Sequence, residues 1–187
     1  MTIEQFKDKV LPFMLLHEGG YSNRKADNGG ETYRGVTRKN NPDWEGWAML
    51  APLKPKNGDI FNHAGLKEAV ADLYYKKYFK ANKFDEIESP IVALCLFDLA
   101  VNGGYSVAVV QAALISAIGS NIKKDGEFGP KTLAAINSAN PLVLCKAIND
   151  YRETRFHRIV ERDASQEVFL EGWINRVRKL NAQIRKG

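Results

Sequence analysis

The chain has 187 residues, of which 44% are apolar and 26% are charged. These values are ordinary for a globular protein, and they exclude a disordered, collagen-like or low-complexity chain. No apolar run reaches the roughly 18 residues that a membrane span needs. The first residues also lack the pattern of a signal peptide, because Lys7, Asp8, Lys9 and Pro12 interrupt the apolar side chains. We therefore expect one domain, or one with a small companion, and no membrane span.

The net charge of +5 is unevenly distributed. Residues 1–100 carry 14 basic and 14 acidic side chains, whereas residues 101–187 carry 13 and 8. A basic second half favours an anionic partner, such as nucleic acid, an acidic polymer or a membrane surface. A solvated helix face explains the same charges, and charge alone carries no specificity.

The first 60 residues divide into a helix and an irregular segment. Apolar side chains repeat at helical spacing from Phe6 onward, so we predict an amphipathic helix over residues 2–18 that Thr2 caps. Residues 19–60 are rich in Gly, Asn, Asp and Pro and show no sustained period. Such a composition indicates an irregular loop, with a short hairpin near Glu31–Thr37.

The rest of the chain is predicted to be helical. Ser89 and Pro90 introduce a very apolar helix, Ile91–Val101, which belongs at the centre of the fold. Further helices are expected from Asn62 to Lys80, Ser106 to Ile118, Gly129 onward for a short length, Asn140 to Arg162, and Ser165 to Ile184. The predicted fold class is mainly α (α+β), with a small β-hairpin and loop excursion near residues 19–60.

Glu18 and Asp27 are the candidate catalytic pair. Glu18 ends the predicted first helix, where the negative end of the helix dipole disfavours an ionised carboxylate and raises its pKa. A raised pKa suits a general acid, and glycosidases pair such an acid with a second, ionised carboxylate. Asp27 lies in a polar loop further along and fits that second role. The alternative is that Glu18 is a solvated helix-end residue and Asp27 a turn former.

Four blocks of sequence, in a fixed order, carry a resemblance to a known family. They are HEGGY at His17–Tyr21 with the Asp27, Gly29-Gly30, Thr32 and Gly35–Thr37 that follow it, FDLAVNGG at Phe97–Gly104, DGEFGPKT at Asp125–Thr132, and FLEGWINRV at Phe169–Val177. Together they resemble glycoside hydrolase family 108, which comprises N-acetylmuramidases with a lysozyme-like fold, some of them described as secretion activators. The resemblance implies a lysozyme-like catalytic region at 1–100. It also implies a helical peptidoglycan-binding region at 101–187, packed into the same compact fold.

The resemblance further implies the reaction and the partner. The family cleaves the β-1,4 bond between N-acetylmuramic acid and N-acetylglucosamine, and its general acid corresponds to Glu18. We therefore expect a monomeric lysozyme-type enzyme that acts on peptidoglycan glycan strands in the cell wall, outside the cytoplasm, after delivery without an evident signal peptide. The alternative is a non-catalytic module that binds the wall or a secretion component, against which the intact Glu18 and Asp27 argue. A nucleic-acid-binding reading rests only on the charge, and we expect no such partner.

The other candidate site residues are polar or aromatic. The spacing of Glu18, Asp27 and Thr32 also resembles the Glu/Asp/Thr set of phage-type lysozymes, in which the threonine helps to place the attacking water. Thr32 fits the count from Asp27 better than Thr37, and the alternative for either is a purely structural place in the hairpin. Asp98 lies in the apolar helix, where a buried carboxyl group must be paired or neutral, and a structural role is expected for it. The side chains expected to bind substrate are Tyr21, Tyr33, Thr37, Asn102 and Tyr105, and Trp44 and Trp47 are further candidates for sugar stacking. The alternative is plain packing for each aromatic side chain and helix capping for Asn102.

Metal and redox chemistry are not expected. His17, His63 and His157 have no metal-ligand spacing, and Cys95 and Cys145 form no CxxC pair. We therefore predict no metal and no cofactor. Both cysteines lie in apolar runs, which favours two buried thiols.

Overall fold

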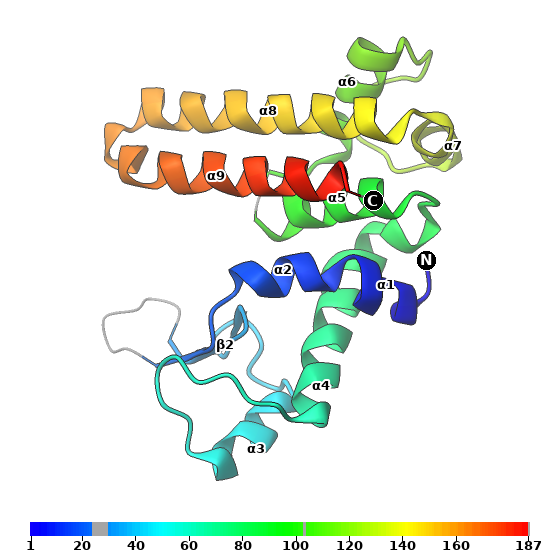
Figure 1. The fold of residues 1–187 in the computed structure, drawn as a ribbon. Coiled ribbons are helices and arrows are strands. Elements are labelled where there is room, and N and C mark those ends of the chain that lie inside the picture. The colour runs from blue at the N-terminus through cyan, green and yellow to red at the C-terminus, as the bar shows by residue number, and fades with distance from the viewer. Residues whose placement is uncertain (24–29, 103, 187) are drawn as a thin grey trace. The chain divides into compact units, whose positions relative to one another are not determined.

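The computed structural model describes residues 1–23, 30–102 and 104–186. They form two compact units, an N-terminal unit at Thr2–Asn82 and a C-terminal unit that begins at Lys83 and includes Met1 (Figure 1). Helices dominate both units and a small sheet lies in the first, so the predicted class of mainly α with a small β excursion is confirmed. Within the described ranges, no helix combines the length and the apolar character that a membrane crossing requires.

The expected helix over residues 2–18 is two helices, α1 (Ile3–Lys9) and α2 (Leu11–His17). The break follows from Pro12, which has no N–H to donate and whose ring clashes with the carbonyl of the preceding turn in a continuous helix. Near the start of α2 that missing donor costs nothing. The N-terminus is as predicted, because Thr2 caps α1 and forms a reciprocal capping box with Gln5.

A three-stranded antiparallel sheet follows α2. Its strands are β1 (Tyr21–Ser22), β2 (Thr32–Tyr33) and β3 (Val36–Thr37), in that spatial order. Tyr33 pairs with Val36, so only Arg34 and Gly35 form the turn of the second hairpin. The hairpin predicted near residues 31–37 is therefore confirmed, and its two-residue turn is of the tight kind that needs positive φ angles.

The remaining helices of the N-terminal unit are α3 (Gly46–Leu50) and α4 (Ala64–Tyr74). The sequence did not predict α3, because its five residues begin with Gly46, lie between Pro42 and Pro52, and are too few to show a period. The segment predicted as a helix to Lys80 continues past α4 as a π-helical turn at Tyr75–Phe79. His63, and not Asn62, caps α4 by accepting a hydrogen bond from the amide of Leu66.

All the regular secondary structure described in the C-terminal unit is helical. Its helices are α5 (Pro90–Val101), α6 (Val107–Ile118), α7 (Pro130–Ser138), α8 (Pro141–Arg162) and α9 (Glu167–Ile184). Ser106 and Asn140 cap α6 and α8 as expected. Ser165 was expected to cap α9, but α9 begins one residue later, after Gln166, because Ser165 belongs to a short 3-10 turn that Asp163 caps.

The core of the C-terminal unit surrounds α5. Every residue from Val92 to Leu99 is buried, which confirms the central position predicted from the apolar sequence. α8 and α9 run antiparallel side by side, and both contact α5 (Figure 1). The only charged residue in that buried stretch is Asp98. A buried charge is costly unless it is paired, so Asp98 needs partners.

Candidate functional site

Glu18 lies at the C-terminal end of α2, as the sequence predicted. It is the C-cap residue, with φ −90° and ψ 129°, and its amide donates a 3.2 Å hydrogen bond to the carbonyl oxygen of Met14. The side chain is half-buried. The two glycines that follow stop the helix here, so the carboxyl group is presented where the chain turns toward the sheet.

The Glu18 carboxylate lies against the turn between β2 and β3. A Cβ atom on Gly35 would stand 2.6 Å from Glu18 Oε2 and 2.3 Å from the hydroxyl oxygen of Tyr74. A side chain at this position would collide with both groups, and its φ of +77° also favours glycine. Gly35 therefore leaves the space in which the carboxylate and the Tyr74 hydroxyl converge.

Arg34 joins the turn to the two helices on either side of this space. Its guanidinium Nη1 donates to the carbonyl oxygens of Leu15, at 3.1 Å, and Glu18, at 3.3 Å. Its own carbonyl oxygen accepts a 3.0 Å hydrogen bond from the hydroxyl of Tyr74 on α4. The end of α2, the hairpin turn and α4 are thus connected around Glu18, and a carboxyl group in such a frame can deliver a proton in a fixed direction.

The two candidate threonines are neighbours in the sheet. Thr32 pairs with Thr37 across β2 and β3, and both are half-buried. The Thr32 hydroxyl donates to the carbonyl oxygen of Gly30 at 3.1 Å. Asp27, the proposed second carboxylate, lies outside the described residues, so its geometry relative to Glu18 and to either threonine is not described. The choice between Thr32 and Thr37 stays a prediction.

The candidate tyrosines of the sheet have packing partners. The Tyr21 hydroxyl donates to Glu31 Oε1 at 3.0 Å, and burial together with this hydrogen bond raises the pKa of Tyr21. Tyr33 is 2% exposed, and its hydroxyl accepts from the amide of Phe61 at 3.2 Å. These contacts fix the hairpin and the following loop, while sugar binding by either residue stays a prediction.

The two tryptophans near the end of the loop are buried. The Trp44 ring nitrogen donates to the carbonyl oxygen of Ala69 on α4, and the Trp47 ring nitrogen donates to that of Asn41. The rings meet edge to face, with centroids 4.9 Å apart. Both tryptophans therefore help to pack α3 within the N-terminal unit, and sugar stacking by either of them stays a prediction.

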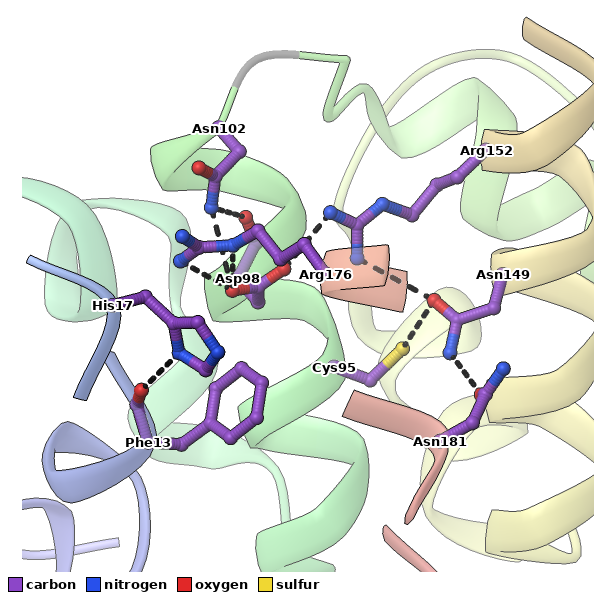
Figure 2. A network of polar contacts seen from close by, with 9 residues as sticks. All are labelled: Phe13, His17, Cys95, Asp98, Asn102, Asn149, Arg152, Arg176 and Asn181. Carbon is purple, nitrogen blue, oxygen red and sulfur yellow. Dashed lines mark hydrogen bonds and ion pairs between the residues drawn. The ribbon is translucent and has the colours of Figure 1, made fainter. Parts of the chain in front are cut away.

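In the C-terminal unit, Asp98 is the centre of a buried ion cluster (Figure 2). Its Oδ2 accepts from Arg152 Nη2 at 2.8 Å, and its Oδ1 accepts from Arg176 Nη2 at 2.8 Å and Nε at 3.0 Å. Asp98 is fully buried and Arg152 is 2% exposed. The expectation of a structural partner for this carboxylate is met by α8 and α9, which supply the two arginines.

Asn102 and Tyr105, the two candidates after α5, have different surroundings. The Asn102 side-chain amide donates to the Asp98 carbonyl oxygen at 2.8 Å and to its carboxylate at 3.3 Å, so it closes the end of α5 (Figure 2). The Tyr105 hydroxyl oxygen is buried and has no hydrogen-bond partner among the described residues. Burial raises the pKa of Tyr105 to about 12.

The DGEFGPKT block wraps around a buried glutamine. Gln111 of α6 donates from Nε2 to the Asp125 carboxylate, at 2.7 Å, and to the Thr132 hydroxyl, at 3.1 Å. Its Oε1 accepts from the amide of Gly126 at 2.9 Å. The hydrogen bond from Gln111, together with one from the amide of Glu127, lowers the pKa of Asp125. The contacts of Gln111 fasten the loop to α6, so the block has a structural role in this unit.

Among the described residues, His, Cys, Asp and Glu side chains form no group of three or more that could hold a metal ion. Cys95 and Cys145 are free and buried, as predicted. A hydrogen bond with Cys95 and burial both raise the pKa of Cys145. Its thiol is therefore poorly suited to act as a nucleophile.

The sequence and fold together assign the family. The chain belongs to the Glycosyl hydrolase 108 family, which matches residues 11–104. Residues 105–178 match a second family, described as a predicted peptidoglycan domain. The resemblance seen in the four sequence blocks is thereby confirmed, and the two families together support a function related to peptidoglycan. No curated protein sequence matches the chain.

A solved structure shares the fold. The structure of Brucella abortus SagA is 22% identical in sequence, with a TM-score of 0.62, and the match covers 98% of this chain and 95% of that chain. At this identity the likeness shows the fold alone. Together with the family, it confirms the expected lysozyme-like, mainly α fold.

Sequence reasoning missed four residues that surround the candidate groups. Tyr74 and Arg34 flank Glu18, and Arg152 and Arg176 pair with Asp98. The buried position of Asp98 required either a partner or a neutral carboxyl group, and the basic second half offered several cations. The residues facing it could be chosen only with the packing of α8 and α9 against α5 in hand.

Proposed function

We propose that the protein is an N-acetylmuramidase that cleaves the β-1,4 bond between N-acetylmuramic acid and N-acetylglucosamine in peptidoglycan. The observation that carries the proposal is the placement of Glu18 at the end of α2, with its carboxylate against Gly35 and beside the Tyr74 hydroxyl. In a chain of a glycosyl hydrolase family, a carboxyl group framed in this way suits the protonation of a glycosidic oxygen.

The proposal gives the neighbouring residues definite roles. Glu18 protonates the leaving oxygen, and Asp27 stabilises the positive charge that develops on the sugar or activates the attacking water. Thr32 or Thr37 places that water. The residues proposed to contact the glycan strand are Tyr21, Tyr33, Thr37, Asn102 and Tyr105.

The C-terminal region is proposed to bind the same polymer. Residues 101–187 hold the entire net charge of +5, and the predicted peptidoglycan domain covers most of them. Attraction to an anionic wall weakens as salt screens it. We further propose that the protein acts as a monomer on the cell wall, outside the cytoplasm.

The decisive experiment replaces Glu18 with glutamine. The amide is nearly the same shape but cannot donate a proton as a carboxylic acid does, so release of reducing ends from purified peptidoglycan should fall by about 10²–10⁴-fold. Glu45→Gln, at an exposed position of the same unit, is the matched control and should keep wild-type activity. Mass spectrometry of the products should find N-acetylmuramic acid at the new reducing ends.

A second candidate function, wall binding without hydrolysis, is favoured by the match of residues 105–178 to a predicted peptidoglycan domain. Co-sedimentation with insoluble peptidoglycan separates the two. The muramidase proposal requires that Glu18→Gln still sediments while reducing ends are lost. A wild-type protein that sediments but releases no reducing ends would instead establish the binding function.

A further inference from the structure

Arg34 has an unusual backbone conformation for its residue type. It occupies the first position of the two-residue turn between β2 and β3, with a φ of +49°. Asparagine, aspartate and glycine are the residues that such a turn favours, because they adopt positive φ readily. A long side chain in this conformation is strained, and strained residues that persist close to a site indicate a function.

The guanidinium of Arg34 supplies contacts that a favoured turn residue lacks. It reaches back to the carbonyl oxygens of Leu15 and Glu18, at 3.1 and 3.3 Å. Carbonyls at the C-terminal end of a helix have no partners within the helix, and a cation there is favourable. The bond to the Glu18 carbonyl acts on the backbone of the residue whose carboxylate lies against Gly35.

The other end of Arg34 is fixed as well. Its carbonyl oxygen accepts from the hydroxyl of Tyr74, which is 3% exposed on α4. The same hydroxyl oxygen lies 2.3 Å from the position that a Cβ atom on Gly35 would occupy. The Glu18 carboxylate lies close to that same position. Arg34 thus connects the C-terminal end of α2, which carries Glu18, to Tyr74 on α4.

We propose that Arg34 is a positioning residue that holds Glu18 in its reactive orientation by fixing the end of α2 to the β2–β3 turn. The role rests on the proposed function of Glu18 as the acid. Arg34 does not touch substrate in this role. It acts through the backbone of Glu18, and the strain in its own backbone is offset by the bonds it makes.

The conformational outlier also provides a sharp test. Arg34→Asn creates an Asn-Gly sequence, which is the most favourable pair for this turn, and removes the guanidinium. Arg34 and Leu15 both line a cavity of about 470 Å³, so water can enter the space left by the guanidinium and hydrate the freed carbonyl oxygen of Leu15. The variant should therefore keep the fold, with a melting temperature equal to or above that of the wild type.

We expect kcat for reducing-end release to fall by about ten- to a hundredfold in Arg34→Asn, since small displacements of a catalytic group have effects of this size. KM should stay within about twofold, because the substrate contacts remain. Arg34→Lys keeps the charge but offers a less extended set of donors, and its kcat should lie between those of the wild type and Arg34→Asn.

Hydrogen exchange gives a second measurement of the same contact. The Glu18 amide should exchange at least about tenfold faster in Arg34→Asn than in the wild type, while the exchange of the Leu66 amide in α4 should not change.

The outcomes distinguish this proposal from the proposed function. If the wild type releases reducing ends and Arg34→Asn does so at the same kcat, the positioning role is overturned while the muramidase stands. A kcat that falls only in step with the melting temperature assigns Arg34 to stability and overturns the role too. If the wild type releases none, the proposed function fails. The exchange measurement still decides whether Arg34 fixes the end of α2, and unchanged exchange overturns that contact.

Discussion

At the scale of single residues, Tyr105 combines two features that have opposite effects on folding. Its hydroxyl oxygen is buried without a hydrogen-bond partner among the described residues, which costs about 1–3 kcal/mol. Its ring packs edge-on against Phe84, with centroids 5.1 Å apart, and this contact favours the folded state. The ring and the hydroxyl therefore act in opposite directions on stability.

Tyr105→Phe keeps the ring and removes the hydroxyl, so the free energy of unfolding should rise by about 1 kcal/mol near neutral pH. The gain should grow in alkali. The pKa of the Tyr105 hydroxyl is about 10 in the unfolded chain and about 12 in the folded protein. The folded state therefore holds this proton more tightly, and the stability of the wild type falls as the pH rises between these values. Urea unfolding across this range measures both effects. Tyr151→Phe, at a position 38% exposed, is the control and should change neither.

The substrate role predicted for Tyr105 gives a second result from the same variant. If the Tyr105 hydroxyl binds a sugar, it gains its hydrogen-bond partner only in the complex with substrate. Tyr105→Phe would then raise KM while stability improves. A variant that is no more stable than the wild type, and that falls in parallel with it above pH 10, would contradict the unpaired burial of this hydroxyl.

At the scale of elements, the ion cluster on Asp98 joins three helices. Asp98 comes from α5, Arg152 from α8 and Arg176 from α9, so one carboxylate accepts from two guanidinium groups. Such a buried pair is not by itself a source of stability, because desolvation offsets the attraction. Its removal from one side is costly, since the remaining charge is left buried and unpaired.

Asp98→Ala should lower the free energy of unfolding by about 3–5 kcal/mol, because Arg152 would stay buried without its counterion. Asp150→Ala is the matched control, since this aspartate pairs with Lys146 on the exposed face of α8 and should cost at most about 0.5 kcal/mol. Chemical denaturation measures both. Unchanged stability in Asp98→Ala, with activity lost from the folded protein, would place Asp98 in the catalytic machinery instead.

Sequence patterns predicted the elements best where the pattern was long. The apolar run of α5 identified a central helix, and the caps at Ser106 and Asn140 located the starts of α6 and α8. α3 was missed because five residues carry no period, and its stability comes from the buried Trp47. Pro12 did carry the signal for the break between α1 and α2, but the periodicity across it was continuous.

The candidate site was predictable only in part, for a physical reason. The position of Glu18 follows from local sequence, a helix that ends before two glycines. Its neighbours Arg34 and Tyr74 lie 16 and 56 residues further along, and they meet it through tertiary packing that no local period encodes. The sequence of the turn carried one signal. A tight hairpin turn favours asparagine or glycine at this position, so an arginine there indicates that its side chain has a partner.

At the scale of the whole molecule, α5 belongs structurally with the later helices. The C-terminal unit begins at Lys83, and within it α8 and α9 cover the buried stretch Val92–Leu99. The family match at residues 11–104 nevertheless includes α5. The region matched by the Glycosyl hydrolase 108 family thus ends inside a compact unit that residues 105–186 complete, and the functional division at residue 100 stays a prediction.

A fragment of residues 1–104 should therefore be insoluble or molten, because it keeps α5 and loses the helices that cover it. Burial of a single large apolar side chain contributes about 1.5–3 kcal/mol, and α5 carries several of them, including Leu94, Leu96 and Phe97. The comparison fragment ends at Asn82, before α5, and spans the compact N-terminal unit. Although shorter, it should stay in solution at higher concentration than 1–104. Centrifugation, near-ultraviolet circular dichroism and binding of a hydrophobic dye measure the difference. A soluble 1–104 fragment with sharp tertiary signals would show that α5 does not need α8 and α9, and that residues 105–187 are a separable accessory region.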